Sequence, residues 1–147
     1  MNAKVETSGR VAVNIPEKAP SPLGSYSHAI RAGQFLYLSG QGARDPESGQ
    51  EVGISVDATG KVTAYDIEAQ TQAVIKNMGA ILEAAGLTLK DLVDVSVFLA
   101  DIADFPKFNK VYSQYFAFEG PPARTTVQAA ALPGKNFIEI KAVAFYP

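Results

Sequence analysis

Near the end of the chain, residues 120–146 read GPPARTTVQAAALPGKNFIEIKAVAFY, and this stretch predicts how the fold is completed. Two runs of apolar and β-branched residues flank a Pro-Gly pair, a pattern typical of two strands joined by a turn. Each run also carries an ionisable residue that a plain core strand would avoid. Arg124 follows a double proline, and Glu139 stands between two isoleucines. Because strand side chains alternate, Glu139 is expected on the face opposite its neighbours.

Two amphipathic helices and one strand are predicted before this segment. Residues 67–85 place apolar side chains at helical spacing, with Thr63 as the expected N-cap and Gly86 as the stop. Residues 104–120 (DFPKFNKVYSQYFAFEG) predict a second helix with an aromatic face, closed by Gly120. Between them, DLVDVSVFLAD at 91–101 has the β-branched content of a buried strand.

The first third of the chain predicts strands and loops. Residues 24–42 (GSYSHAIRAGQFLYLSGQG) indicate two strands that meet at residues 32–34. Residues 43–61 are rich in turn pairs such as Asp-Pro and Ser-Gly, which mark loops. The residues up to Pro20 predict an irregular arm or a short added strand. We therefore expect an N-terminal arm, 1–20, and one domain, 21–147.

These elements predict an α+β fold: a mixed six-stranded sheet with two helices packed on one face. The other face must be solvated or covered by another subunit. After Arg124, the alternation places Val127, Ala129 and Ala131 on one side of the strand, with Thr126 and Gln128 on the other side, beside Arg124. This mixed composition favours a subunit interface over bulk water.

Length and charge exclude several classes of function. The chain has 147 residues, which suits one domain, and a net charge of −2 from 13 basic and 15 acidic residues. No basic run appears, so nucleic acid and anionic membranes are not expected as partners. No apolar run approaches the roughly 20 residues that cross a bilayer. A cytoplasmic location is the expectation.

The chain has no cysteine and one histidine, His28. These counts exclude a thiol nucleophile, a disulfide framework and a cysteine-based zinc site, including that of the zinc deaminases. A Ser-His-Asp triad would depend on His28, and no G-x-S-x-G motif is present. If the protein is an enzyme, we expect it to work without a metal, another cofactor or a covalent intermediate.

Arg124 and Glu139 are the strongest candidates for a site, although each could be a surface charge. The prolines before Arg124 fix the direction of a guanidinium suited to a carboxylate, and a half-buried Glu139 could take a proton from water. A simple hairpin with its loop at 133–136 would pair Glu139 near Ala130, roughly 20 Å from Arg124. Either the two strands are not hairpin partners, or the residues meet across a subunit boundary.

Other polar residues have two interpretations each. Tyr26 and His28 alternate on one expected face, but a lone histidine is more often a hydrogen-bonded structural residue. Arg31 and Arg44 are typical of solvated surface charges, and Asn109 of a polar helix surface. The Phe and Tyr stripe of the second helix is typical of a core.

Four segments, at 24–41, 69–86, 91–112 and 121–144, together resemble the Rid family of reactive-intermediate enamine/imine deaminases, formerly grouped as YjgF. The resemblance covers about residues 20–146. It implies a chorismate-mutase-like α+β fold and a homotrimer whose sheets line a central barrel, with active sites at the subunit interfaces.

The resemblance also implies roles for particular residues. Arg124 matches the arginine that grips the substrate α-carboxylate, and Glu139 the carboxylate that positions the attacking water. Thr126 stands where many members have cysteine, at a position that acts largely through its backbone. Five further positions match residues that line the cleft: Tyr26, Ser39, Gly40, Phe105 and Asn109.

Three shorter matches, SHAIR, GARDP and DIEAQTQAVIKNM, are similar to the 2-aminomuconate deaminases of aromatic degradation. The substrate of that branch is a dicarboxylate, so a second cation is expected beside Arg124. Arg44, Arg31 or His28 could supply it. The implied reaction converts 2-aminomuconate to 2-oxo-3-hexenedioate (4-oxalocrotonate) and ammonia. The alternatives are a general deaminase of 2-iminobutanoate and 2-iminopropanoate, or a non-catalytic trimer that binds small carboxylates.

Overall fold

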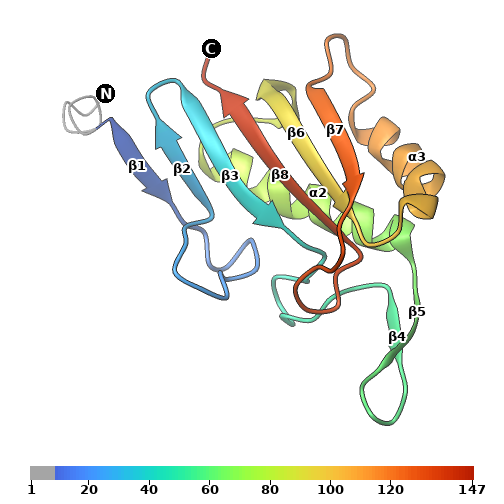
Figure 1. Cartoon of the computed structure of the whole chain (residues 1–147). Helices are drawn as coiled ribbons and strands as arrows, with labels where there is room; N and C mark the ends of the chain where they lie inside the picture. The colour runs from blue at the N-terminus through green and yellow to red at the C-terminus, as the bar shows by residue number, and fades with distance from the viewer. Residues whose placement is uncertain (1–8) are drawn as a thin grey trace.

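The computed structural model describes residues 9–147, which form a six-stranded sheet, a separate hairpin and two helices (Figure 1). The large sheet contains β1 (Arg10–Val13), β2 (Ala29–Ala32), β3 (Phe35–Gln41), β6 (Leu92–Leu99), β7 (Ala123–Gln128) and β8 (Ile138–Phe145). The hairpin contains β4 (Ile54–Val56) and β5 (Val62–Tyr65). The helices are α2 (Ile67–Ala84) and α3 (Phe105–Tyr115), each next to a 3₁₀ turn, η1 (Leu89–Asp91) or η2 (Ile102–Asp104).

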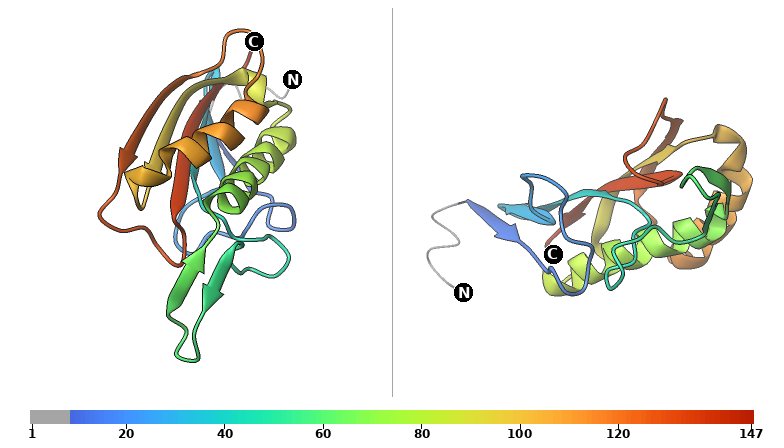
Figure 2. Two further views of the ribbon diagram at one scale, coloured as in Figure 1. Left: turned by 90° about the vertical axis from the view of Figure 1, so that its right-hand side faces the viewer. Right: turned by 90° about the horizontal axis from the view of Figure 1, so that it is seen from below.

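The strand order of the large sheet is β1-β2-β3-β8-β6-β7. All neighbours are antiparallel except β6 and β7, which run parallel on either side of the crossover through α3. Figure 2 shows both helices on one side of this sheet. The predicted α+β class, with a mixed six-stranded sheet and two helices on one face, is confirmed. Within the predicted arm, Arg10–Val13 is the short added strand, and residues 1–8 lie outside the described part.

The predicted hairpin between the last two strands is wrong. β6 lies between β7 and β8 and pairs with both, so the two strands are not neighbours. The loop after β7 instead returns the chain past β6, and β8 enters as a central strand of the sheet (Figure 1). β7 also ends at Gln128, so the predicted alternation does not continue to Ala131.

Three local boundaries differ from the prediction as well. The loop predicted at 43–61 contains the start of the β4–β5 hairpin, which a short turn at Asp57 closes with hydrogen bonds from Thr59 and Lys61 to its carboxylate. Helix α2 is capped by Asp66, whose side chain accepts from the Ala69 N–H at 3.1 Å, because Thr63 belongs to β5. Helix α3 ends at Tyr115, well before Gly120.

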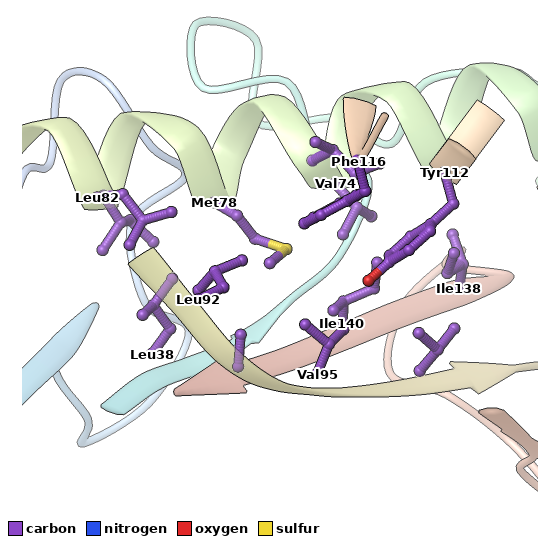
Figure 3. Close-up of a cluster of buried hydrophobic side chains, with 14 of the residues drawn as sticks. Leu38, Val74, Met78, Leu82, Leu92, Val95, Tyr112, Phe116, Ile138 and Ile140 are labelled. Atoms are coloured by element: carbon purple, nitrogen blue, oxygen red, sulfur yellow. The ribbon is translucent and has the colours of Figure 1, made fainter. Parts of the chain in front are cut away.

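The core lies between the helices and the sheet. Figure 3 shows α2 residues Val74, Met78 and Leu82 facing the strand residues Leu38 and Ile140. All five side chains are buried, since the inward positions of the strands meet the apolar stripe of the helix. Within residues 9–147, neither helix is both long and apolar enough to cross a bilayer.

The opposite face of the sheet has no covering element within the described chain. It exposes large apolar side chains: Phe35, Tyr37 and Val127 are 40%, 44% and 43% exposed. Charged residues lie among them, as the exposed Lys141 of β8 shows. An apolar surface of this kind on one sheet face is the usual mark of an interaction surface.

Candidate active site

The predicted site residues fall into two groups. One group surrounds a cavity of about 230 Å³ at the β3–β8 end of the sheet, and the other surrounds Arg124 on β7. Five of the predicted residues line the cavity: Tyr26, His28, Gly40, Arg44 and Glu139. The remaining cavity residues were not predicted: Pro20, Leu23, Gln41, Gly42, Pro133 and Asn136.

Glu139 lies against a bulge of β3. Leu38 pairs with Ala142 and Gln41 with Ile140, so the two residues between them on β3 oppose only Lys141 of β8. Such bulges bend a strand and are common next to functional sites.

Gly40, inside this bulge, makes room for the carboxylate. A Cβ at position 40 would lie 2.6 Å from Glu139 Oε2, so only glycine allows Glu139 its present position. The other bulge residue, Ser39, donates from Oγ to the Ser27 carbonyl at 2.7 Å and thereby holds the segment before β2.

His28 lines the cavity, but its burial and hydrogen bonds are those of a structural residue. Its side chain is 1% exposed, and Nδ1 accepts the Ile15 N–H at 3.0 Å while Nε2 lies 2.8 Å from the Pro20 carbonyl. Nε2 is therefore the protonated nitrogen, and neither ring nitrogen is left for a ligand. Tyr26 does not share a strand face with His28, because β2 begins only at Ala29 and Tyr26 is 50% exposed.

Arg44 is the cation best placed in the cavity. Its Nη2 donates to the Ser21 carbonyl at 2.7 Å, and its backbone forms a bridge with Glu51. Within the described chain the guanidinium makes no salt bridge, so most of its donors remain for a ligand. Arg31, the other arginine considered, is stacked on the Tyr146 ring at 3.8 Å and does not line this cavity.

The second group holds Arg124 between β7 and α3. Arg124 Nη1 donates to Asn109 Oδ1 at 2.9 Å. The guanidinium carbon lies 4.6 Å from the ring centre of Tyr112, 5.4 Å from that of Phe108 and 5.6 Å from that of Phe105. The aromatic stripe predicted as core therefore also forms a cation–π environment that orients the arginine.

Two buried hydroxyls accompany Arg124 on this side of the sheet. Tyr112 Oη and Thr126 Oγ1 have no hydrogen-bond partner among the described residues. Burial raises the pKa of Tyr112, and the nearby charge of Arg124 opposes that shift. Buried polar groups are normally paired, so this group retains hydrogen-bonding capacity for a ligand or water.

Arg124 and Glu139 do not face each other within one chain. Arg124 pairs with Val95, which is buried under the helices, whereas Glu139 pairs with Phe98 and alternates with buried isoleucines. The two residues therefore point to opposite faces of the sheet. They also lie two strands and three residues apart, about 14 Å in the plane of the sheet. Of the two alternatives left open, the strands are indeed not hairpin partners, yet the residues remain separated.

Asn136 is the most informative residue that the prediction missed. Its Oδ1 accepts the Ala43 N–H at 2.7 Å, and a Cβ at Gly42 would lie 2.5 Å from the same oxygen. The available signal was the glycine-rich SGQG segment, which indicates close approach of another group but not its identity. Among residues 9–147, no cluster of three or more His, Asp or Glu side chains has the arrangement of a metal site.

The fold makes the chain an α+β protein with one helix-covered and one bare sheet face. Its sequence matches the profile of the Endoribonuclease L-PSP family over residues 16–146. The chain therefore belongs to this family, which is the Rid/YjgF family predicted from the sequence.

Individual relatives agree with this assignment. The chain is 46% identical to a RutC family protein of Pyrococcus abyssi over 88% of its own length and 92% of the relative. It is 43% identical to the human 2-iminobutanoate/2-iminopropanoate deaminase, covering 86% of the chain and 84% of the relative. A crystal structure of a putative endoribonuclease from Thermotoga maritima superposes with a TM-score of 0.81 at 39% identity, covering 93% and 98% of the two chains.

Proposed function

We propose that the protein is a hydrolytic deaminase of enamine or imine carboxylates, with 2-aminomuconate as its substrate. The proposal rests on two preorganised groups, one around Arg124 and one around Glu139. Arg124 is held by Asn109 and three aromatic rings, and Glu139 lies in a cavity with Arg44. The human relative named 2-iminobutanoate/2-iminopropanoate deaminase supports the reaction type.

The two groups act together only if two copies of the chain meet. The bare apolar sheet face supports a homotrimer, in which the Arg124 group of one copy completes the Glu139 cavity of the next. A head-to-tail contact of this type closes into a ring, and three copies then hold three equivalent sites. In this arrangement Arg124 and Glu139 of one site come from different chains, so their separation of about 14 Å within one chain does not matter.

The proposed reaction uses binding and proton transfer. Arg124 binds the carboxylate beside the reacting carbon through two parallel hydrogen bonds. The enamine takes up a proton at carbon to give the imine, and a water that donates to Glu139 adds to the C=N carbon. Glu139 takes one proton from the water and passes it to nitrogen, which gives a carbinolamine. The carbinolamine hydroxyl then gives its proton to nitrogen through Glu139, the C=O bond forms as the C–N bond breaks, and ammonia leaves a 2-oxo acid. Positioning supplies most of the rate gain because the imine is intrinsically reactive.

Arg44 adapts this scheme to a dicarboxylate. Arg44 lines the Glu139 cavity and its guanidinium has one hydrogen-bond partner among the described residues, the Ser21 carbonyl, so it would bind the carboxylate far from the reacting carbon. The product from 2-aminomuconate is then 2-oxo-3-hexenedioate. His28 is omitted from this role because both of its ring nitrogens contact backbone groups.

The family description also suggests RNA cleavage, and two observations disfavour it for this chain. The net charge is −2, whereas RNA-binding surfaces are basic. The single histidine is buried and has no free nitrogen for acid–base catalysis. The remaining alternatives are a general 2-imino acid deaminase and a non-catalytic carboxylate-binding trimer.

Ammonia release from freshly generated 2-aminomuconate tests the proposal. The wild-type protein should accelerate release, and Arg124→Ala and Glu139→Ala should abolish most of the acceleration. A parallel assay with 2-iminobutanoate separates the substrates, because Arg44→Ala should reduce kcat/KM for the dicarboxylate far more than for the monocarboxylate. Wild-type rates in both site variants would contradict the site. Ligand binding without turnover would favour the non-catalytic trimer.

A further inference from the structure

Asn77 on α2 lies directly behind the segment that carries Arg44. The residue is 3% exposed, although its helix neighbours Val74 and Met78 are apolar core residues. Its Nδ2 donates to two carbonyls, that of Gly42 at 3.1 Å and that of Arg44 at 2.9 Å. One buried amide thus holds both ends of the three-residue turn that follows β3.

A second buried amide, two helical turns earlier, holds the neighbouring segment that carries Asn136, a residue that also lines the cavity. Gln70 is 0% exposed, and its Oε1 accepts the Phe137 N–H at 2.8 Å. Its Nε2 donates to the Val52 carbonyl at 3.1 Å and the Lys135 carbonyl at 3.0 Å. Gln70 therefore fixes the segment that leads into Glu139, whereas Asn77 fixes the segment that carries Arg44.

The turn at residues 42–44 depends on these side chains because it has left the sheet. Its partners are the bridge between Arg44 and Glu51, the Val52 N–H that donates to the Ala43 carbonyl, the side-chain oxygen Oδ1 of Asn136 and the Asn77 amide. Backbone carbonyls buried without a partner are costly, so the Asn77 donors determine where the turn can lie. A shift of the Arg44 backbone would move the base of its side chain and change where the guanidinium, bonded to the Ser21 carbonyl, can reach.

We propose that Asn77 is a positioning residue that sets the preference for dicarboxylates by fixing Arg44 relative to Glu139. This inference rests on the proposed function, since Arg44 has a role only if the substrate carries a second carboxylate. Displacements of about 1 Å in a group that orients the substrate can change rates by up to about a hundredfold. The effect should therefore appear in the selectivity between substrates as well as in stability.

The test compares kcat/KM for 2-aminomuconate with kcat/KM for 2-iminobutanoate in the purified full-length protein. Asn77→Leu removes both donors at similar volume, and it should lower the ratio of the two values by about tenfold, chiefly through a higher KM for the dicarboxylate. Thr71→Val is the matched control. Thr71 is equally buried on α2, but its hydroxyl bonds only to Ile67 of the same helix. Thr71→Val should lower the free energy of unfolding but leave the ratio of the two kcat/KM values unchanged.

A double variant decides whether Asn77 acts through Arg44. Once Arg44→Ala has lowered the ratio, adding Asn77→Leu should lower it no further. Asn77→Ser, which keeps one donor, should give an intermediate ratio and serves if Asn77→Leu does not fold. Equal losses on both substrates, or additive effects in the double variant, would overturn the inference. If Arg44→Ala alone leaves the ratio unchanged, the dicarboxylate proposal itself fails, which is a distinct result.

Discussion

The Arg124 group and the Glu139 cavity are built in different ways, although the proposed reaction needs both. Arg124 is placed by regular structure: a strand, a helix and three aromatic rings surround its guanidinium. Glu139 also lies on a strand, but its surroundings are a bulge, a glycine and loops held by side-chain amides. The first group suits tight binding of one fixed anion. The second suits adjustment to different substrates by changes in loops.

In the proposed reaction neither group is a complete site. They lie on opposite faces of the same sheet, so under the proposed roles a chain that acts alone would bind a carboxylate without placing the water. A bare apolar face beside Glu139 provides the surface on which a second copy could supply the missing arginine. The following predictions test this division of roles, beginning with the largest expected effect.

Arg124→Ala should reduce kcat/KM by about a thousandfold, equivalent to about 4 kcal/mol, because a buried charge partner of the substrate is lost. Arg124→Lys is the control, since it keeps the charge but not the planar pair of donors, and it should recover only part of the loss. Steady-state ammonia release measures both. Full activity in the lysine variant would show that charge alone suffices.

Glu139→Gln should lower kcat by about a hundredfold and leave KM nearly unchanged, because the amide keeps the shape but cannot accept a proton from water. Measuring kcat and KM together distinguishes the roles of the two groups. Arg124 variants should change KM strongly, whereas Glu139 variants should not. A Glu139→Gln protein with raised KM and normal kcat would assign Glu139 to binding.

Gly40→Ala should lower kcat by about tenfold with little loss of stability, because the new methyl group would displace the Glu139 carboxylate, the mobile end of a flexible side chain. Gly79→Ala is the control. Gly79 lies within α2 with no atom near its added Cβ, so alanine there should stabilise the helix. Denaturant titration and the ammonia assay report the two effects separately.

The smallest expected effect concerns Tyr65, which connects the two groups. Its ring stacks on Phe137 at 3.7 Å, two residues before Glu139, and its hydroxyl donates to Asp104 Oδ2 at 2.6 Å, just before α3. Burial and then the Asp104 contact raise the pKa of Tyr65 to about 12, from about 10 in an unfolded chain.

Because folding favours the neutral phenol, this contribution to stability is complete below about pH 10 and is lost between about pH 10 and pH 12. Tyr65→Phe lacks this titration. Its deficit in the free energy of unfolding relative to wild type should therefore shrink on going from pH 8 to pH 11.5. A deficit that stays constant over this range would show that the hydroxyl does not contribute through its protonation state.

The sequence predicted where helices and strands lie along the chain better than it predicted which strands are neighbours in the sheet. Apolar periodicity identified α2 and the strands β2, β3, β6, β7 and β8 because it reports burial within one segment, but it missed the β4–β5 hairpin. It could not show that β6 separates β7 from β8, since partner choice depends on the whole sheet. Arg124 and Glu139 were recognisable as charges within apolar strands. Gln70 and Asn77 were not, because a polar residue on a helix acquires a role only from the loops packed against it.

The central claim, that each site combines Arg124 of one copy with Glu139 of another, is tested most directly by mixing the two inactive variants. Arg124→Ala and Glu139→Ala chains, unfolded together and refolded, should regain about a quarter of the wild-type ammonia release, because random assembly makes about a quarter of the interfaces intact on both sides. Each variant refolded alone should remain inactive. If the mixture is no more active than its components, both residues act within one chain and the account is wrong.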